Sequence, residues 1–375
     1  MSTALRARIL VVDDEPGLQN TVRRILARNH DVSVASSGPE ALAILQRTPH
    51  DLAIVDVRMP GMNGFEVLKA IKAAHADTEV IIMTGSISNP EEKLVEALRE
   101  QAFYFIAKPF EKMVLETLVD RCLERQRLER EKRDWTQALE RDLEQARRFQ
   151  RMLLPRAFPR VPHLRGDVIY APSEILSGDF YDFFDLGHSR VGVLIADVSG
   201  HGVSAALYTG MVKSEMLSVR DEFEHPDVLF ARINERLGVT AQRRRHVTAL
   251  LVILDTESRR LRYVNAGHPG FFTAAGLAWE STGPPLGMLE GAVYEVREAA
   301  LVPGERLFLY TDGILEAMRP DGTEFGFDRI RDAFDATRGL LPDAAVAAVV
   351  NAVQRFTGSE EFADDATAIV LELMP

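Results

Sequence analysis

Residues 53–61 read AIVDVRMPG, and residues 194–202 read LIADVSGHG. Both stretches are apolar runs that end in an aspartate, followed by a valine and by residues that favour turns. A short apolar run that closes on a carboxylate is typical of a buried strand ending at a concave sheet edge. The residues around Asp56 and Asp197 are otherwise unlike, which argues against an internal repeat and predicts two separate sites.

The composition is that of a folded protein with more than one domain. The chain has 375 residues, which is too long for one ordinary core and predicts two or three domains. Its 46% apolar and 27% charged content is typical of soluble folded chains. The net charge of −12 argues against nucleic acid or an anionic membrane as the main partner.

Three features of the sequence indicate a cytoplasmic location. The first apolar stretch, residues 9–12, is too short for a signal peptide and is followed at once by acids. No later run approaches the ~18 residues that span a bilayer. Cys122 is the single cysteine, which excludes an internal disulfide. We therefore expect a cytoplasmic protein without membrane contact.

The first third of the chain alternates short β-branched runs with amphipathic stretches such as residues 90–101. This alternation predicts an α/β fold with a doubly wound parallel sheet, whose ligands gather at the carboxyl ends of the strands. The expected strands lie within residues 8–14, 31–36, 51–56, 79–85 and 103–110.

Acidic residues follow two of these expected strands. Asp13 and Asp14 close the first strand and Asp56 closes the third, so three carboxylates should converge on one crevice and require a cation. Hard oxygen ligands with open positions suit Mg²⁺. Thr84 and Lys108 end the fourth and fifth strands and add a hydroxyl and an ammonium group. This set suits an aspartate that accepts a phosphoryl group.

The pattern resembles the receiver domain of two-component response regulators. The resemblance implies a flavodoxin-like fold that binds Mg²⁺ and is phosphorylated at Asp56 by a sensor histidine kinase, with Lys108 contacting the phosphoryl group. It also implies that Thr84 and Phe105 form a switch pair, although Phe105 fits an ordinary core position equally well. Capping of helices by the acids is the alternative, but it does not explain Lys108. The resemblance rests on Asp13-Asp14, Asp56 with Met59-Pro60-Gly61, Thr84, and Lys108-Pro109-Phe110.

A stretch without glycine or proline lies between Pro109 and Pro155. Its charged middle carries one stripe of mainly apolar residues at steps of three and four, which predicts a parallel coiled-coil dimer through a linker over residues 124–155. A single solvated helix is the alternative, but it would leave Trp135 and Phe149 in water. The stripe consists of Leu128, Lys132, Trp135, Leu139, Asp142, Ala146, Phe149 and Leu153.

Residues 156–375 have the texture of an α+β domain with layered, largely antiparallel sheets. Residues 247–272 read as two strands joined by a polar turn at residues 255–258. Helical patterns follow Gly202 and span residues 342–356.

Acids recur in four separate turns of this part of the chain. Their side chains can meet only by folding, and they come without cysteine or a histidine pair, so the expected ions are Mg²⁺ or Mn²⁺ rather than zinc. Two such ions about 4 Å apart can clamp a phosphoryl group for attack by water. The acids are Asp179, Asp197, Asp312 and the pair Asp364-Asp365.

The order of these acids resembles the type-2C metal-dependent serine/threonine phosphatases, in the bacterial branch of sporulation and stress-response enzymes. The resemblance covers residues 145–375 and includes FQRMLLP at residues 149–155 and NAGHPG at residues 265–270. It implies two Mn²⁺ or Mg²⁺ ions, a substrate phosphoprotein that is an anti-sigma-factor antagonist, and catalysis that depends on Asp197. The implied ligands are Asp197, bridging both ions, the carbonyl of Val198, Asp179 on one ion, and Asp312 with Asp364 on the other.

Some residues depart from this pattern or remain unassigned. Ser177 stands where the family usually has a glycine, and Asp365 is a weaker ligand candidate than Asp364. His201 has no assigned role. The basic run at residues 242–246 could attract phosphate, but a solvated loop is the preferred interpretation. The stretch SGDFYD gives only a glancing likeness to nucleotide cyclases.

These observations predict a receiver at residues 1–123, a linker at 124–155 and a phosphatase at 156–375. Phosphorylation of Asp56 would act through the linker helix on the ligands near Asp179 and Asp197. A phosphorylation-controlled adaptor that binds a partner without turnover is the alternative. Metal-dependent turnover that is lost in Asp197→Asn would separate the two. A transcription factor is disfavoured, because no helix-turn-helix pattern follows Pro155 and the chain is acidic.

Overall fold

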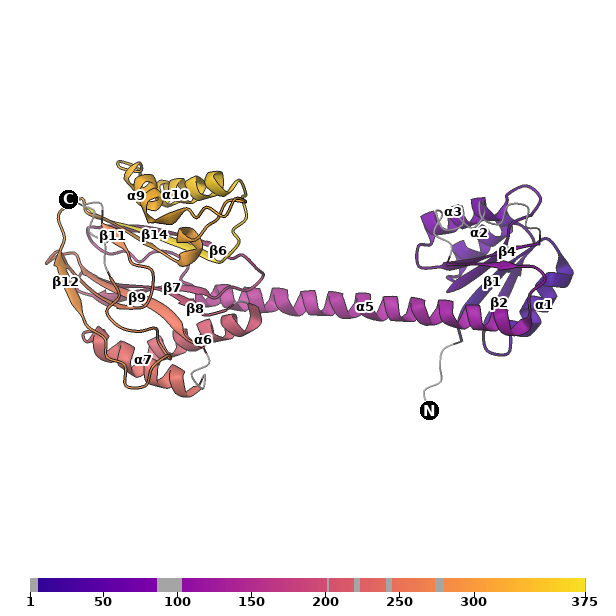
Figure 1. The fold of residues 1–375 in the computed structure, drawn as a ribbon, viewed down its shortest axis with the longest axis horizontal. Helices are drawn as coiled ribbons and strands as arrows, with labels where there is room; N and C mark the ends of the chain where they lie inside the picture. Colours follow the sequence, from indigo (N-terminus) through magenta and orange to yellow (C-terminus); the bar gives the residue numbers. More distant parts are fainter. Residues whose placement is uncertain are drawn as a thin grey trace. The chain divides into compact units, whose positions relative to one another are not determined.

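The computed structural model describes residues 6–85, 103–200, 202–218, 223–240, 245–273 and 280–374. The chain divides into two compact units, Met1–Leu139 and Glu140–Pro375, and helix α5 (Lys112–Leu153) contributes to both (Figure 1). Within the described ranges, no helix combines the length and apolar character that crossing a bilayer requires. Three features singled out in the sequence lie outside these ranges: the amphipathic stretch at residues 90–101, His201, and residues 242–244 of the basic run.

The first unit is built on a five-stranded sheet in which every pairing is parallel. The strand order β2-β1-β3-β4-β5 reverses direction next to β1, as in doubly wound folds, and confirms the predicted fold class. The strands are β1 (Arg8–Val12), β2 (Asp31–Ala35), β3 (Leu52–Asp56), β4 (Glu79–Thr84) and β5 (Tyr104–Ala107).

Helices cover both faces of this sheet (Figure 1). Leu10 and Val12 of β1 pack with helices α2 (Gly38–Arg47) and α3 (Gly64–Ala74). The alternate residues of the same strand face the other way, toward α1 (Pro16–Leu26) and the start of α5. Because side chains alternate along a strand, a run of four apolar residues is buried on both sides, which explains the lack of polar alternation in the sequence.

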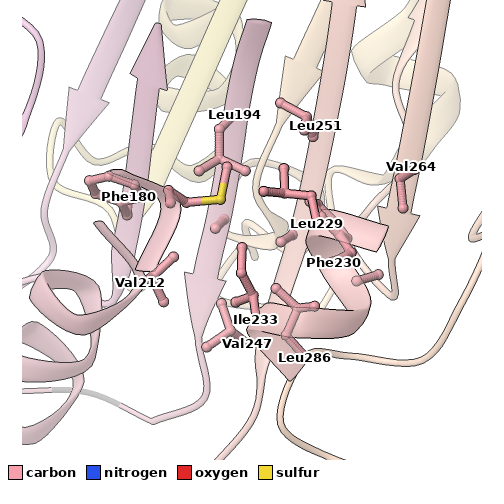
Figure 2. Packing of buried hydrophobic residues seen from close by; sticks show 14 of the residues in the cluster. Phe180, Leu194, Val212, Leu229, Phe230, Ile233, Val247, Leu251, Val264 and Leu286 are labelled. Atoms are coloured by element: carbon pink, nitrogen blue, oxygen red, sulfur yellow. The ribbon is translucent and has the colours of Figure 1, made fainter. Parts of the chain in front are cut away.

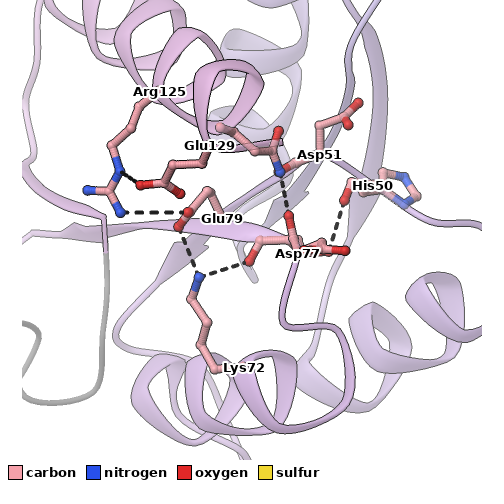
Figure 3. A network of polar contacts seen from close by, with 9 residues as sticks. His50, Asp51, Lys72, Asp77, Glu79, Arg125 and Glu129 are labelled. Atoms are coloured by element: carbon pink, nitrogen blue, oxygen red, sulfur yellow. Dashed lines mark hydrogen bonds and ion pairs between the residues drawn. The ribbon is translucent and has the colours of Figure 1, made fainter. Parts of the chain in front are cut away.

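The first half of α5 is tied to the receiver sheet by a polar network (Figure 3). Gln126 donates to the carbonyl oxygens of Asp51, at 2.9 Å, and Asp77. Arg130 and Arg133 add ion pairs of 3.0 Å to the carboxylates of these two aspartates. Asp51 and Asp77 precede β3 and β4, so the helix is anchored at the amino ends of strands whose carboxyl ends carry Asp56 and Thr84.

The second unit contains two antiparallel sheets, as the sequence predicts. One has the order β12-β10-β9-β8-β7 and the other β11-β13-β14-β6. The hairpin expected at residues 247–272 is β9 paired with β10. The strands are β6 (Leu164–Ala171), β7 (Asp179–Gly187), β8 (Arg190–Val198), β9 (Val247–Asp255), β10 (Arg260–Ala266), β11 (Phe272–Thr273), β12 (Arg297–Ala300), β13 (Arg306–Tyr310) and β14 (Ala366–Leu373).

The two sheets face each other and carry helices on their outer sides (Figure 1). Val193 and Ile195 of β8 fill the space between the sheets, while Leu194 and Ala196 pack beneath α6 and α7 (Figure 2). Each fully buried leucine of this kind contributes about 1.5–3 kcal/mol. The helices are α6 (Gly202–Ser218) and α7 (Pro226–Thr240) on the first sheet, with α8 (Asp312–Leu315), α9 (Gly326–Asp335) and α10 (Pro342–Thr357) on the side of the second.

Candidate functional site

The carboxyl edge of the parallel sheet brings two predicted carboxylates and the predicted lysine into contact. Lys108, directly after β5, places its Nζ 2.7 Å from Asp13 Oδ2 and 2.6 Å from Asp56 Oδ1. Burial lowers the pKa of Lys108, but its hydrogen bonds to Asp13 and Asp56 outweigh this and hold the pKa above its ordinary value. Lys108 is therefore a fixed cation between two buried acids.

The other predicted residues of the receiver site differ in how far they are buried. Asp14 is exposed, whereas Thr84 is buried at the end of β4, and among the described residues its hydroxyl has no hydrogen-bond partner. Phe105 is half-buried and packs with the cluster beneath α2 and α3. Asp56 also accepts a hydrogen bond of 2.9 Å from the backbone N–H of Arg58. The available donors are all oxygens, which suits Mg²⁺.

A second set of acids lies at one edge of the antiparallel sheets. Asp179 and Asp197 are directly opposite each other on β7 and β8. Asp179 is 1% exposed, and its Oδ2 accepts hydrogen bonds from the hydroxyls of Thr311, at 2.8 Å, and Thr367, at 2.5 Å. Its Oδ1 is buried and has no partner within the described part of the chain. Burial and the nearby charge of Asp197 raise the pKa of Asp179 well above its ordinary value.

Asp312 and Asp364 extend this acidic edge from the second sheet. Gly313, next to Asp312, packs so closely on the turn that a Cβ there would lie 2.0 Å from the carbonyl oxygen of Asp365 and 3.3 Å from that of Asp364. Burial and the charges of Asp312 and Asp364 raise the pKa of Asp197 to about 7. Burial and Asp364 likewise raise the pKa of Asp312. Four acids from four turns therefore repel one another at a single edge.

The donor chemistry of this edge fits divalent cations. A buried carboxylate oxygen without a partner and like charges that raise one another's pKa are relieved by a bound cation. In the described ranges, no three His, Cys, Asp or Glu side chains already stand in metal-binding geometry. The fit therefore rests on burial, repulsion and oxygen donors, which suit Mg²⁺ or Mn²⁺. The carbonyl oxygen of Val198 lies at the same edge, because a Cβ on Gly178 would be 2.9 Å from it.

Two residues near this edge have roles that sequence reasoning did not assign. Asp365 is buried, and its carboxylate accepts hydrogen bonds from Ser173 N and Oγ, at 2.8 and 3.0 Å, and from Gly178 N, at 2.7 Å. Gln150, near the end of α5, donates to the carbonyl oxygen of Ser177 at 2.6 Å and accepts from its N–H at 3.1 Å. The sequence indicates these contacts only weakly, through the adjacent acids Asp364 and Asp365 and through a polar Gln150 at the apolar end of the helix.

Ser177, which departs from the family motif, and His268, which belongs to it, both have simple structural accounts. Ser177 is fully buried, and its hydroxyl accepts a hydrogen bond of 3.1 Å from the N–H of Asp179, so the small polar side chain supports the ligand turn. His268 of the NAGHPG stretch is buried, and burial lowers its pKa to about 3, so the ring is neutral. Its Nδ1 lies 3.1 Å from the hydroxyl of Thr248, the residue opposite Asp197 on β9.

Comparisons with known proteins identify both units. The stage II sporulation protein E (SpoIIE) family matches residues 187–374, and the response regulator receiver domain matches residues 9–120. Protein IcfG of Synechocystis sp. is 26% identical over 261 residues, which cover 61% of this chain and 41% of that protein. Phosphoserine phosphatase RsbP of Bacillus subtilis is 27% identical over 241 residues, covering 62% of this chain and 58% of that protein. The chain thus spans about half the length of these two relatives.

A solved structure agrees with the fold of the second unit. The SiaA-PP2C domain of Pseudomonas aeruginosa superposes with a TM-score of 0.55 at 19% identity, over 63% of this chain and 98% of that domain. The likeness extends to the layered sheets and supports the fold alone. The match of the family model over half of its residues shows that the chain belongs to the SpoIIE family, and it carries a response regulator receiver domain ahead of the family domain.

Proposed function

We propose that this chain is a response regulator whose phosphorylation at Asp56 controls a Mn²⁺- or Mg²⁺-dependent protein serine/threonine phosphatase. The observation that carries the proposal is the directly opposed pair of buried Asp179 and half-buried Asp197, whose pKa values are both raised. Divalent ions bound there would supply an activated water and neutralise phosphoryl oxygens. In this proposal the ions would be bound by the carboxylates of Asp179, Asp197, Asp312 and Asp364 and by the carbonyl oxygen of Val198.

The receiver edge supports the phosphorylation step. Asp56 would be the nucleophile for phosphoryl transfer, and Asp13, Asp14 and Asp56 itself would hold Mg²⁺. Lys108 already contacts Asp56 and would balance the charge of an added phosphoryl group. The unpartnered hydroxyl of Thr84 is available to donate to a phosphoryl oxygen.

The partners follow from the relatives and from the domain combination. A receiver implies a sensor histidine kinase as phosphoryl donor, and RsbP is named a phosphoserine phosphatase. We assign the substrate as phosphoserine or phosphothreonine on an anti-sigma-factor antagonist, in the cytoplasm. The proposed domains are residues 1–123, 124–155 and 156–375.

Helix α5 is the proposed route of control. Its first half is anchored to the receiver through Gln126, and its end contacts the backbone of Ser177, two residues before Asp179. The predicted stripe includes large apolar side chains that are more than half exposed, which supports a homodimer through this helix. They are Leu128, Trp135, Leu139 and Phe149.

A phosphorylation-controlled adaptor is the second candidate. The observation in its favour is that, within the described residues, the acids do not already form a metal-binding group. An adaptor of this kind would bind the partner phosphoprotein and show no metal-dependent release of phosphate.

The deciding experiment measures initial phosphate release from p-nitrophenyl phosphate by the full chain with Mn²⁺, with and without beryllofluoride as a mimic of the Asp56 phosphate. We expect turnover that requires Mn²⁺ and changes when beryllofluoride is added. Absence of turnover on this substrate and on a phosphoserine protein, with metal bound, would favour the adaptor.

Leu139→Pro tests the route through α5. Proline removes a backbone donor and clashes with the preceding turn, which costs about 3 kcal/mol of helix stability. We expect Mn²⁺-dependent turnover to persist and its response to beryllofluoride to disappear. The matched variant Leu139→Ala keeps the helix and should keep the response. A response that survives in Leu139→Pro would refute control through this helix.

A further inference from the structure

Arg245, the described arginine of the basic run, lies beside the turn that follows Asp197 and has no role so far. It precedes β9, whose Thr248 lies opposite Asp197. The backbone next to it is fixed to the turn after Asp197: Ser199 N–H donates to His246 O at 3.0 Å, and His246 N–H donates to Ser199 Oγ at 3.1 Å. Arg245 therefore has a defined place beside the candidate metal ligands.

The guanidinium of Arg245 is held by neutral groups. Its Nη1 donates to the carbonyl oxygen of Ser199 at 2.6 Å, and its Nη2 donates to the hydroxyl of Ser204 at 2.7 Å. The ring of Tyr208 lies 5.8 Å from Cζ. Among the residues that the structure describes, no carboxylate forms an ion pair with Arg245. Its positive charge is thus held in place without being neutralised by any described residue, and a guanidinium has five N–H donors in total.

Gly200 permits this placement. Its φ of +89° is in the region that favours glycine, and a Cβ there would lie 2.7 Å from Arg245 Nη1. Gly178 lies between this turn and Asp197. A Cβ added to Gly178 would be 3.3 Å from the carbonyl oxygen of Gly200 and 3.1 Å from Asp197 Oδ1. The guanidinium of Arg245, the turn at Gly200 and the carboxylate of Asp197 therefore lie in sequence along this edge.

We propose that Arg245 binds the phosphoryl group of the substrate phosphomonoester. The four acids repel an anionic phosphoryl group wherever their charge is not balanced, and a protein cation fixed beside them would help to orient that group. A guanidinium fork, held here by two hydrogen bonds, matches the spacing of two phosphoryl oxygens. The inference deepens the proposed phosphatase function, and its test does not depend on turnover.

The test is equilibrium binding of inorganic phosphate to the full chain with Mg²⁺, for wild type, Arg245→Gln and Arg245→Lys. Arg245→Gln is expected to weaken phosphate binding about tenfold or more, because a charged hydrogen-bond donor is lost. Arg245→Lys keeps the charge without the fork and should weaken binding about threefold. If the chain turns over p-nitrophenyl phosphate, Arg245→Gln should also raise KM by about tenfold, with the Mn²⁺ concentration for half-activation unchanged.

The control is Arg260→Gln, which removes the same charge from the opposite end of the same sheet, where Arg260 pairs with Asp255 on β9. It should leave phosphate binding unchanged. Equal phosphate affinity in wild type and either Arg245 variant overturns the proposal. So does a change in the Mn²⁺ requirement with unchanged phosphate affinity, which would mean that Arg245 only positions the turn at Ser199. Lack of turnover in wild type counts against the phosphatase alone, since phosphate binding is measured separately.

Discussion

Asp197→Asn in the full chain is expected to lower kcat for p-nitrophenyl phosphate with Mn²⁺ on the order of a thousandfold. Asp197 lies at the centre of the acidic edge, opposite Asp179 and coupled electrostatically to Asp312 and Asp364. An amide at this position keeps the shape of the side chain but loses the charge that would hold two cations. The initial rate should therefore fall without a change in the fold.

The same substitution is expected to stabilise the chain when divalent ions are removed. The pKa of folded Asp197 is raised to about 7, above the ordinary value of 3.8, so its ionised form is disfavoured in the folded state. The resulting loss of stability begins as pH rises through the lower value and is complete above the folded-state pKa. In EDTA, Asp197→Asn should raise the melting temperature by a few degrees at pH 8 and leave it unchanged at pH 4.

Asp255→Asn provides the matched control at the far end of β8 and β9, where Asp255 pairs with Arg190. Burial raises the pKa of Asp255, but hydrogen bonds from Ser258 and Glu257 outweigh this and lower it. Its substitution should leave kcat unchanged and, if anything, reduce stability above pH 4. Unaltered turnover in Asp197→Asn, or a lower melting temperature in EDTA at pH 8, would contradict the assigned role.

The receiver was largely predictable because its chemistry follows from local patterns. Short apolar runs form parallel strands whose carboxyl ends share one edge, so the positions of Asp13, Asp56 and Lys108 after their strands were enough to expect them together. Asp14 shows the limit of this reasoning. It is adjacent to Asp13 in sequence but exposed, and it lies in the bend after β1, beyond the last strand residue Val12.

For the acidic edge of the second unit, the sequence predicts which acids take part but not the hydrogen bonds that position them. The hydroxyls that hold Asp179 come from Thr311 and Thr367, which are distant in sequence and meet it only through the packing of two antiparallel sheets. The same holds for the contact of Gln150 with Ser177. Such hydrogen bonds depend on tertiary register, for which strand periodicity carries no information.

The two Asp-Val turns now differ in physical terms. Asp56 is paired with a lysine at 2.6 Å, so its charge is balanced within the protein and one more anionic group can be added beside the same cation. Asp197 faces acids and has a raised pKa, so its charge must be balanced by something that the protein binds. The first arrangement suits a group that accepts a phosphoryl group, and the second suits a group that binds metal ions.

Asp56→Asn is expected to reduce phosphoryl incorporation from acetyl phosphate to background. The amide keeps the size of the side chain and one oxygen, which can accept only one of the two hydrogen bonds that Asp56 receives, from Lys108 at Oδ1 and from the N–H of Arg58 at Oδ2. It cannot act as the nucleophile, because the attacking carboxylate oxygen is gone. Turnover at the second site should persist in this variant, while its response to beryllofluoride should be lost.

Asp51→Asn is the informative partner variant, because Asp51 precedes the same strand and pairs with Arg130 of α5 at 3.0 Å. It should accept the phosphoryl group as wild type does, since it leaves the carboxyl edge intact. If Asp56→Asn still incorporated phosphate, Asp13 or Asp14 would have to be the acceptor. If both variants lost incorporation, the effect would reflect damage to the sheet rather than the missing nucleophile. Loss in Asp56→Asn alone therefore assigns the acceptor to the end of β3.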